Sequence, residues 1–405
     1  MNPAIFRAYD IRGVYGVDFD DSAAEMIGRS YAAFLSPQTV VVGGDNRLSS
    51  PPLKDAIARG LLGCGVNVID VGTVPTPLLN FAIIFFEADG GIMVTASHLE
   101  KEYNGFKMAR AHAIPLIDEE IQEVRKIIEE DKVAPPAESS GRYRTQDVDS
   151  VYLKDLTSKI AIPESGKRLK VAVDTGNGTG GPVIESLLAA LGIEGIFLFT
   201  RPDGTYPNHH PDPTVEETLV PLKDAIRKGG CDLGIAMDGD ADRAVFLDDT
   251  EEIIRGDQAL AIFARDALQK KAKAEVLFEV KCSRLLPEDI RAHGGVPVMG
   301  RTGHSFIKRH MKDDPDIVVA GEMSGHFFFR EFHSIDDAFF ASAKMIEILS
   351  KSGQRLSEIL ASLPKYHSTP EIRLRVAEER KFTVVEEVKQ EFEGLKEQGA
   401  DITIV

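Results

Sequence analysis

The sequence predicts an α/β protein with three related mixed-sheet domains and an incomplete C-terminal α+β domain. The order strand, polar loop, helix, glycine, strand occurs three times, at points more than about a hundred residues apart, which is typical of repeated domains rather than a solenoid. The last segment contains only one strand, one helix and the start of another strand. The expected domains are residues 1–150, 151–252, 253–365 and 366–405.

The first domain begins with a helix that the segment Asp20-Asp21-Ser22 caps and Pro37 ends. The first copy of the repeated pattern follows it. Its predicted elements are a buried strand at 40–45, a helix through 53–61, a strand at 66–71 and a glycine-flanked strand at 90–94.

The second copy and the third copy repeat this order with different loops, so each domain can contribute a different part of one shared site. The second copy has strands at 169–174 and 193–199 around a helix through 183–188, and the third has strands at 275–280 and 296–299 around a helix at 285–292. The expected domain junctions are residues 131–141, 248–251 and 362–364. The last segment is predicted to have a strand at 371–376, a helix through Val384, Val388 and Phe392, and the start of a strand at 401–405.

The composition excludes several classes of protein. With 405 residues, 43% hydrophobic and 27% charged, the chain is typical of globular proteins. A net charge of −17 argues against a nucleic-acid partner. We expect no membrane association, because no apolar run reaches the ~20 residues of a membrane span and the N-terminus has no signal-peptide pattern. Three widely spaced cysteines argue against disulfides and favour the cytoplasm.

Three carboxylates alternate in a short loop between two apolar strands. Asp238, Asp240 and Asp242 can converge on one hard cation such as Mg²⁺, which prefers oxygen ligands. An EF-hand is the main rival, but it needs glycine where Arg243 stands and helices where strands are predicted. An ordinary acidic turn is the other alternative. Arg243 suits a phosphoryl oxygen beside the metal.

Two further loops carry groups suited to catalysis or recognition. Ser97 and His98 follow the strand at 90–94, as an exposed nucleophile does, although a hydrogen-bonded turn is the commoner reason for such a pair. Glu322, Ser324 and His326 alternate after the apolar run 317–320 and can bond the hydroxyl groups of a sugar. Lys107, Lys281, Arg301 and His304 add basic groups, whereas His209 and His210 fit a rigid interface loop better than a metal site.

The N-terminal segment 6–13 contains Tyr9 and Arg12, and taken alone it fits a solvated strand. Together with 95–98, 238–243 and 321–326, however, it has the order and spacing of the α-D-phosphohexomutases. The sequence resembles this family over essentially its whole length. Met323 makes the loop 321–326 most similar to the bacterial phosphomannomutase/phosphoglucomutase branch.

The resemblance implies a four-domain fold whose central cleft interconverts hexose 1-phosphate and hexose 6-phosphate. It implies a phosphoserine enzyme, a hexose 1,6-bisphosphate intermediate that also acts as activator, and Lys107 or His304 as general acid or base. Hexose phosphates are the expected partners, and a monomer or weak homo-oligomer the expected state. The implied catalytic residues are Ser97, His98, Arg12, Lys107, Arg243 and His304. The implied substrate-binding residues are Tyr9, Lys281, Glu322, Ser324 and His326. The implied Mg²⁺ ligands are Ser97, Asp238, Asp240 and Asp242.

Three departures from the family pattern favour an alternative, a catalytically impaired phosphosugar-binding protein or a truncated mutase. Leu99 and Glu100 replace the usual Asn-Pro, so we expect a looser nucleophile loop and an added negative charge. Ala241 replaces a glycine and would be strained if φ is positive there. No Arg-x-Ser-(Asn/Gly)-Thr-x-Pro segment is present to hold the second phosphate. Losing its hydrogen bonds would lower kcat/KM by about 10²–10⁴. A generic Mg²⁺ phosphatase is a third hypothesis.

Overall fold

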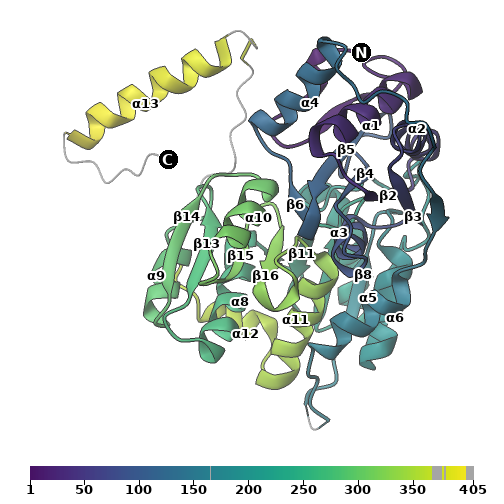
Figure 1. Cartoon of the computed structure of the whole chain (residues 1–405). Helices are drawn as coiled ribbons and strands as arrows, with labels where there is room; N and C mark the ends of the chain where they lie inside the picture. The colour runs from purple at the N-terminus through teal and green to yellow at the C-terminus, as the bar shows by residue number, and fades with distance from the viewer. Residues whose placement is uncertain (165, 367–375, 378–379, 398–405) are drawn as a thin grey trace. The chain divides into compact units, whose positions relative to one another are not determined.

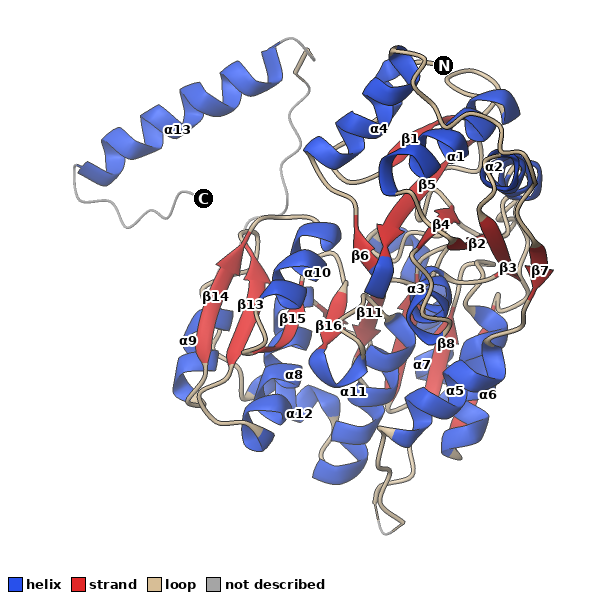
Figure 2. Ribbon diagram, viewed as in Figure 1, coloured by secondary structure: helices blue, strands red, loops and turns tan. Residues whose placement is uncertain are grey.

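The computed structural model describes residues 1–164, 166–366, 376–377 and 380–397. The chain divides into two units, Met1–Pro364 and Lys365–Val405 (Figure 1). The first unit contains three β-sheets with helices packed on them (Figure 2), which confirms the predicted α/β class with three mixed-sheet domains.

The first sheet has the strand order β1-β5-β4-β2-β3-β7, with β6 beside β5. Strands β4, β2, β3 and β7 are parallel, and β5 runs antiparallel to both β4 and β1. The strands are β1 (Ile11–Val14), β2 (Thr39–Gly44), β3 (Asn67–Thr73), β4 (Gly90–Val94), β5 (Tyr103–Arg110), β6 (Ile114–Pro115) and β7 (Tyr143–Thr145). The helices are η1 (Pro3–Ile5), α1 (Asp21–Leu35), α2 (Ser50–Gly63), α3 (Thr76–Phe85), η2 (Ala111–Ala113) and α4 (Glu119–Glu129). The Asp20 side chain accepts a hydrogen bond from Ala23 N, so the predicted cap is confirmed.

The second sheet has the order β12-β11-β10-β8-β9. Its strands are β8 (Lys170–Asp174), β9 (Glu194–Leu198), β10 (Leu233–Met237), β11 (Ala244–Leu247) and β12 (Ile253–Ile254), and its helices are α5 (Asp149–Ser158), α6 (Gly181–Leu191), η3 (Glu216–Leu219) and α7 (Val220–Gly229). Strands β9, β8 and β10 are parallel, and β11 returns antiparallel to β10.

The third sheet has the order β14-β13-β15-β16. Its strands are β13 (Glu275–Glu279), β14 (Val296–Gly300), β15 (Ile317–Gly321) and β16 (Phe327–Phe329). The helices of this part are α8 (Gly256–Lys270), α9 (Leu285–Ala292), α10 (His304–Asp313), η4 (Arg330–Phe332), α11 (Ala338–Ser352) and α12 (Leu356–Ala361). Again the first three strands are parallel and the last is antiparallel.

The three sheets repeat one connection. In each of them the third parallel strand (β4, β10 or β15) is followed by a loop and then by an antiparallel neighbour (β5, β11 or β16). These three loops are the Ser97 loop, the Asp238–Arg243 loop and the Glu322–His326 loop. The repeated topology therefore places the three predicted loops at equivalent positions.

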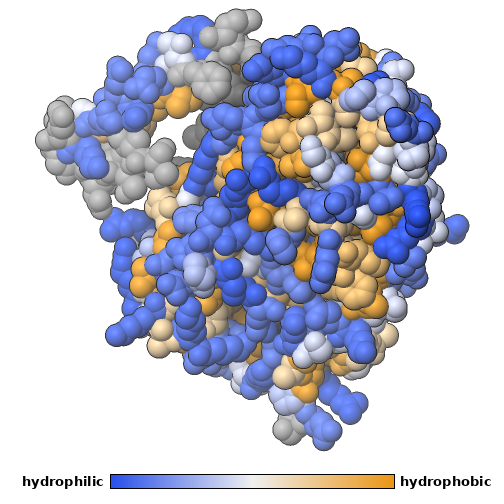
Figure 3. All heavy atoms as spheres, viewed as in Figure 1, coloured by the Kyte–Doolittle hydropathy of each residue, from blue (hydrophilic) through white to orange (hydrophobic). Residues whose placement is uncertain are grey.

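One hydrophobic core runs through the three sheets. It joins Leu78 of α3, Ile184 of α6, Phe263 of α8 and Phe339 of α11, all of them buried. Tyr152 of α5 packs edge-on against Phe339 of this core. The face shown in Figure 3 is mostly hydrophilic, with smaller hydrophobic areas between the charged side chains. Among the described residues, no helix has the length and hydrophobicity that crossing a membrane requires.

The second unit contains helix α13 (Lys381–Glu397), as predicted for residues 384–392. Val385, Val388, Phe392 and Leu395 of this helix are exposed. Of the strand predicted at 371–376, residues 371–375 lie outside the described residues and Val376 is not in a strand; the start of a strand predicted at 401–405 also lies outside them.

Candidate active site

Ser97 lies in the loop after β4 and is buried, with 1% of its surface exposed. Its φ is +53°, in the left-handed region that non-glycine residues rarely adopt. This backbone turn directs Oγ toward the second domain, where it donates a 2.7 Å hydrogen bond to Asp238 Oδ2. His98 Nδ1 is 3.1 Å from the same Oγ. Burial and the charges of Arg243 and Arg12 hold the pKa of His98 far below its ordinary value, so the imidazole is neutral.

The three predicted metal ligands meet in one cluster. Asp238, Asp240 and Asp242 are fully buried, and one oxygen from each lies within 4.8 Å of the others. Burial and the two neighbouring carboxylates raise the pKa of Asp238 well above its ordinary value. Asp240 Oδ1 is buried and has no hydrogen-bond partner, which is uncommon for a buried carboxylate. An all-oxygen donor set with an unpaired oxygen fits a hard divalent cation.

Two groups of the first domain partly neutralise this cluster. Lys107 of β5 places Nζ 2.7 Å from Asp240 Oδ2 and 2.5 Å from Asp242 Oδ2. Burial opposes the charge of Lys107, but Asp240 and Asp242 prevail and raise its pKa. Thr76, the first residue of α3, donates from Oγ1 to Asp240 Oδ2 (2.6 Å) and from its backbone N–H to Asp240 O (2.9 Å). The positive end of the α3 dipole therefore faces the carboxylates.

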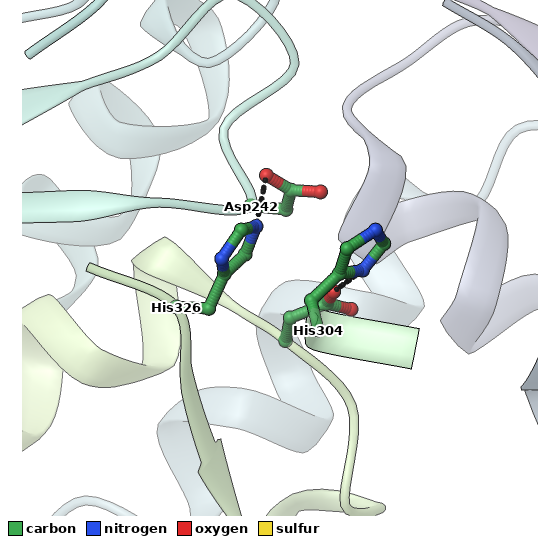
Figure 4. Close-up of side chains that lie close together, drawn as sticks. Asp242, His304 and His326 are labelled. Atoms are coloured by element: carbon green, nitrogen blue, oxygen red, sulfur yellow. Dashed lines mark hydrogen bonds and ion pairs between the residues drawn. The ribbon is translucent and has the colours of Figure 1, made fainter. Parts of the chain in front are cut away.

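The loop after β15 meets the aspartate cluster through His326 (Figure 4). His326 Nε2 is 3.3 Å from Asp242 Oδ1, and Nδ1 is 2.8 Å from Glu322 Oε2. Ser324 Oγ lies 3.1 Å from the same Nδ1. Burial opposes the positive charge of His326, but Asp242 and Glu322 outweigh it and raise the pKa to about 9. The predicted recognition loop is thus assembled around a protonated imidazole.

His304, the first residue of α10, stacks on His326 with ring centroids 4.9 Å apart. Its Nδ1 is 2.7 Å from Asp336 Oδ2, while its buried Nε2 has no partner. Lys308 Nζ lies 2.6 Å from the other Asp336 oxygen. Burial lowers the pKa of His304, although Asp336 counteracts this effect. The ring of Tyr9 contacts His304 edge-on, with centroids 5.2 Å apart. Lys107 and His304 line one small cavity, together with Tyr9 and Lys308.

The other predicted residues are two arginines beside the aspartates, Arg243 and Arg12, and one lysine, Lys281, beside Glu279. Arg243 donates from its backbone N–H to Asp238 Oδ1 (3.2 Å), and its Nε is 3.3 Å from His326 Nε2. Arg12 in β1 has Nε 2.6 Å from Asp10 Oδ2. Lys281 lies in the loop after β13, with Nζ 3.7 Å from Glu279 Oε1.

Several residues that hold the site together have no distinctive sequence pattern. Glu279 is buried and links the third-domain loops, accepting hydrogen bonds from Thr302 Oγ1 (2.5 Å) and Met323 N (3.1 Å). Asp336 fixes His304. Arg47 is fully buried under the Ser97 loop. Arg47 follows the buried strand β2 together with Asp45 and Asn46, and loops after parallel strands form sites, but nothing in this polar triplet distinguishes Arg47.

Two departures from the family pattern can now be located. Leu99 and Glu100 both point their backbone carbonyls at Arg47 Nη atoms, at 2.7 and 2.6 Å. Ala241 has φ +54°, so the condition for strain stated above is met. Its methyl group is accommodated because Gly180 faces it, where an added Cβ would lie only 2.9 Å from Ala241 Cβ.

Comparisons with known proteins agree with this site. Residues 3–134, 150–251 and 255–366 match the models of α/β/α domains I, II and III of phosphoglucomutase/phosphomannomutase. The chain is 41% identical to the phosphomannomutase/phosphoglucomutase of Pseudomonas aeruginosa strain PAO1, covering 96% of this chain and 83% of that protein. It is 42% identical to the phosphoglucomutase of Neisseria meningitidis serogroup A, covering 97% of this chain and 85% of that protein.

A solved structure shows the same similarity. The crystal structure of a phosphoglucomutase/phosphomannomutase family protein from Burkholderia thailandensis has a TM-score of 0.86 and 37% identity, over 91% of this chain and 81% of that one. Three domain matches in order and relatives at about 40% identity establish the family. The chain therefore belongs to the phosphoglucomutase/phosphomannomutase family of α-D-phosphohexomutases.

Proposed function

We propose that this phosphohexomutase interconverts the 1- and 6-phosphates of glucose, mannose or both through a phosphorylated Ser97. One observation carries the proposal. The Ser97 hydroxyl is bonded to Asp238 in a buried three-carboxylate cluster, and Asp242 of that cluster faces His326 of the sugar-recognition loop. The proposed nucleophile, Ser97, and the proposed sugar-binding residue His326 thus both contact the candidate cation site.

Asp238, Asp240, Asp242 and Ser97 are the residues that would hold Mg²⁺. When bound, this ion supplies positive charge that neutralises a phosphoryl group on Ser97. Lys107 and Arg243 add fixed positive charge on the same side of the site. Arg12 and neutral His98 lie next to these groups and complete the surroundings of a phosphoserine.

The transfer runs in two balanced steps. The sugar 6-hydroxyl of a hexose 1-phosphate attacks phosphoserine 97, so the Oγ–P bond breaks, an O6–P bond forms, and the hydroxyl proton passes to a base. The bisphosphate then reorients. Ser97 Oγ attacks the phosphoryl group at O1, so the O1–P bond breaks, the Oγ–P bond forms again, and O1 takes the proton, giving the hexose 6-phosphate.

Geometry favours His304 over Lys107 as the base. Asp336 accepts the Nδ1 proton of His304, which leaves the unpaired Nε2 as the acceptor. Lys107 is held as an ammonium between two carboxylates.

The sugar is proposed to bind to Tyr9, Lys281, Glu322, Ser324 and His326. Residues 1–150, 151–252 and 253–365 are the domains that supply nucleophile, cation site and sugar loop, and 366–405 belongs to a fourth. The protein is proposed to act in the cytoplasm, as a monomer or a weak homo-oligomer.

A coupled assay tests this function. It uses glucose 1-phosphate and mannose 1-phosphate with Mg²⁺ and catalytic glucose 1,6-bisphosphate, and Ser97→Ala is the control. Turnover and ³²P labelling of Ser97 that the variant loses are the expected results. Saturable hexose-phosphate binding without labelling would instead indicate a phosphosugar-binding protein. Steady release of phosphate would indicate a phosphatase.

A further inference from the structure

Arg47 lies directly beneath the Ser97 loop and is one of the largest fully buried side chains of the described residues. It stands in the loop after β2, two residues beyond Asp45. Its Nε is 3.0 Å from Asp45 Oδ2, and both side chains have no exposed surface. The ring of Tyr206, from the second domain, lies 5.4 Å below the guanidinium. A buried charge of this kind is costly unless every donor is used.

All five N–H donors of Arg47 are used. Besides the Nε bond to Asp45, the two terminal nitrogens donate to four backbone carbonyls of one loop. Nη2 binds the carbonyls of Ser97 (2.8 Å) and Leu99 (2.7 Å). Nη1 binds those of Glu100 (2.6 Å) and Tyr103 (3.2 Å). One planar side chain therefore fixes the course of the chain on the C-terminal side of the nucleophile.

Asp45, the ion-pair partner of Arg47, fixes the chain on the N-terminal side of Ser97. Asp45 Oδ2 accepts a 2.8 Å hydrogen bond from Thr95 Oγ1, and Thr95 Oγ1 accepts one from Ser97 N (2.9 Å). Both backbone groups of Ser97 thus belong to one network. Holding a non-glycine residue at positive φ costs about 1–2 kcal/mol, and bonds to charged groups offset a cost of that size.

We propose that Arg47, with Asp45 and Thr95, is a positioning residue for the nucleophile. It holds Ser97 in the left-handed conformation in which Oγ faces Asp238. The role in phosphoryl transfer rests on the function proposed above, whereas the holding of the loop does not. Lysine cannot replace Arg47, because an ammonium has three donors and no planar fork.

Arg47→Lys is the test variant and Arg29→Lys is its matched control. Arg29 is also an arginine of the first domain that binds a backbone carbonyl, through Nε (3.1 Å) and Nη2 (2.9 Å) to Ala134 O, but it lies away from Ser97. Two quantities are measured. One is amide hydrogen exchange over residues 95–103, and the other is the single-turnover rate of ³²P transfer from glucose 1,6-bisphosphate to Ser97.

Arg47→Lys is expected to raise exchange over residues 95–103 about 10-fold and to slow labelling about 10²-fold, with the Kd for glucose 1-phosphate changed less than about 3-fold. Arg29→Lys is expected to change neither quantity. Unchanged exchange in a folded Arg47→Lys protein overturns the proposal, and so does an equal effect of Arg29→Lys.

Two further measurements cover the cases in which Arg47→Lys does not fold or the wild-type protein is not labelled. If Arg47→Lys does not fold, Thr95→Val removes the bond to Ser97 N while leaving the Arg47–Asp45 pair intact. Faster exchange at Ser97 in that variant supports the network, and wild-type exchange overturns it. If the wild-type protein incorporates no ³²P, the proposed function fails, and the exchange measurement still decides the role of Arg47.

Discussion

Two buried clusters share Asp242 and differ in how their charges are balanced. In the aspartate cluster (Asp238, Asp240 and Asp242), three carboxylates face the ammonium of Lys107 and the guanidinium of Arg243, whose Nε is 3.9 Å from Asp238 Oδ2. In the histidine cluster (Asp242, His304, His326 and Asp336), two carboxylates face two imidazoles, and Lys308 pairs with Asp336.

This difference in charge balance indicates which function each cluster is suited to. In the aspartate cluster the carboxylates crowd together, which raises the pKa of Asp238, and Asp240 Oδ1 has no hydrogen-bond partner, so a divalent cation completes the cluster. The histidine cluster is balanced internally and keeps one proton on His326 and one free acceptor on His304. The first is suited to binding charge and the second to holding and moving protons. Since Asp242 belongs to both, a change in one cluster is expected to alter the other.

The largest expected effect comes from removing one carboxylate of the aspartate cluster. Asp240→Asn should lower kcat/KM by at least about 10³-fold and weaken Mg²⁺ binding, because the cation loses a charged ligand. Chelation of the wild-type protein should have the same effect on activity. Asp70→Asn is the control, since Asp70 is buried and paired with Lys54 at 2.7 Å but belongs to neither cluster. Wild-type Mg²⁺ affinity in Asp240→Asn, measured by calorimetry, would contradict the assignment.

Removing the ammonium should reveal how far Lys107 stabilises the protein without metal. Lys107→Met leaves Asp240 buried without its ammonium partner and Asp242 paired with His326 alone, and breaking a buried ion pair typically costs about 3–5 kcal/mol of unfolding free energy. Mg²⁺ should recover most of that loss, because it replaces the missing positive charge. Urea unfolding with EDTA and with Mg²⁺ measures both effects. Equal stability of variant and wild type in EDTA would show that the aspartates need no counter-charge.

The pH dependence of stability tests the histidine cluster. In the metal-free protein the pKa of His326 is about 9, above the ~6.5 of an unfolded chain. The stabilisation from this group is therefore complete below pH 6.5 and is lost as the pH rises through about 9, a change of about 3 kcal/mol. His326→Gln should flatten this dependence, while His112→Gln, at an exposed site, should not.

Mg²⁺ should sharpen the same comparison. A cation on Asp242 weakens the attraction between that carboxylate and His326, so the midpoint of the His326 titration should move to lower pH. NMR titration of the imidazole protons measures it with and without Mg²⁺. An unchanged midpoint would show that the two clusters titrate independently.

The smallest effect concerns the backbones of the two loops. The recognition loop has glycine at its left-handed position (Gly325, φ +93°), whereas the aspartate loop has Ala241 at φ +54°. Ala241→Gly should change stability by no more than about 1 kcal/mol, because relief of strain offsets the lost methyl burial. Gly180→Ala should cost about 1–3 kcal/mol, since its Cβ would lie 2.9 Å from Ala241 Cβ. The double variant should recover most of that loss, and additive losses in thermal unfolding would contradict this packing.

Much of the fold could be predicted because its signals are local. Apolar runs that end in glycine or aspartate mark the parallel strands and the loops that follow them, and the helix at Leu285–Ala292 was predicted with its observed bounds. The family motifs then predicted that loops far apart in sequence would converge. Ser97 and Asp238, 141 residues apart, are hydrogen-bonded as that convergence requires.

The supporting residues could not be predicted, since their partners are distant or are backbone atoms. Arg47 binds four carbonyls, and a carbonyl has no sequence signature. Lys107 itself was predicted as a site residue, but its ion pairs with two aspartates 133 and 135 residues away were not. The strain at Ala241 was expected from its residue type, but the space for its methyl group depends on Gly180 in another element.

The separation between Ser97 and Asp238 also has a consequence in time. A ribosome that adds about 5–20 residues per second needs roughly 7–28 s to travel the 141 residues from one to the other. During that interval the first domain can fold around its serine while the carboxylate that receives the hydroxyl does not yet exist. The hydrogen bond between Ser97 and Asp238 therefore forms late in synthesis, once the second domain has emerged and docked.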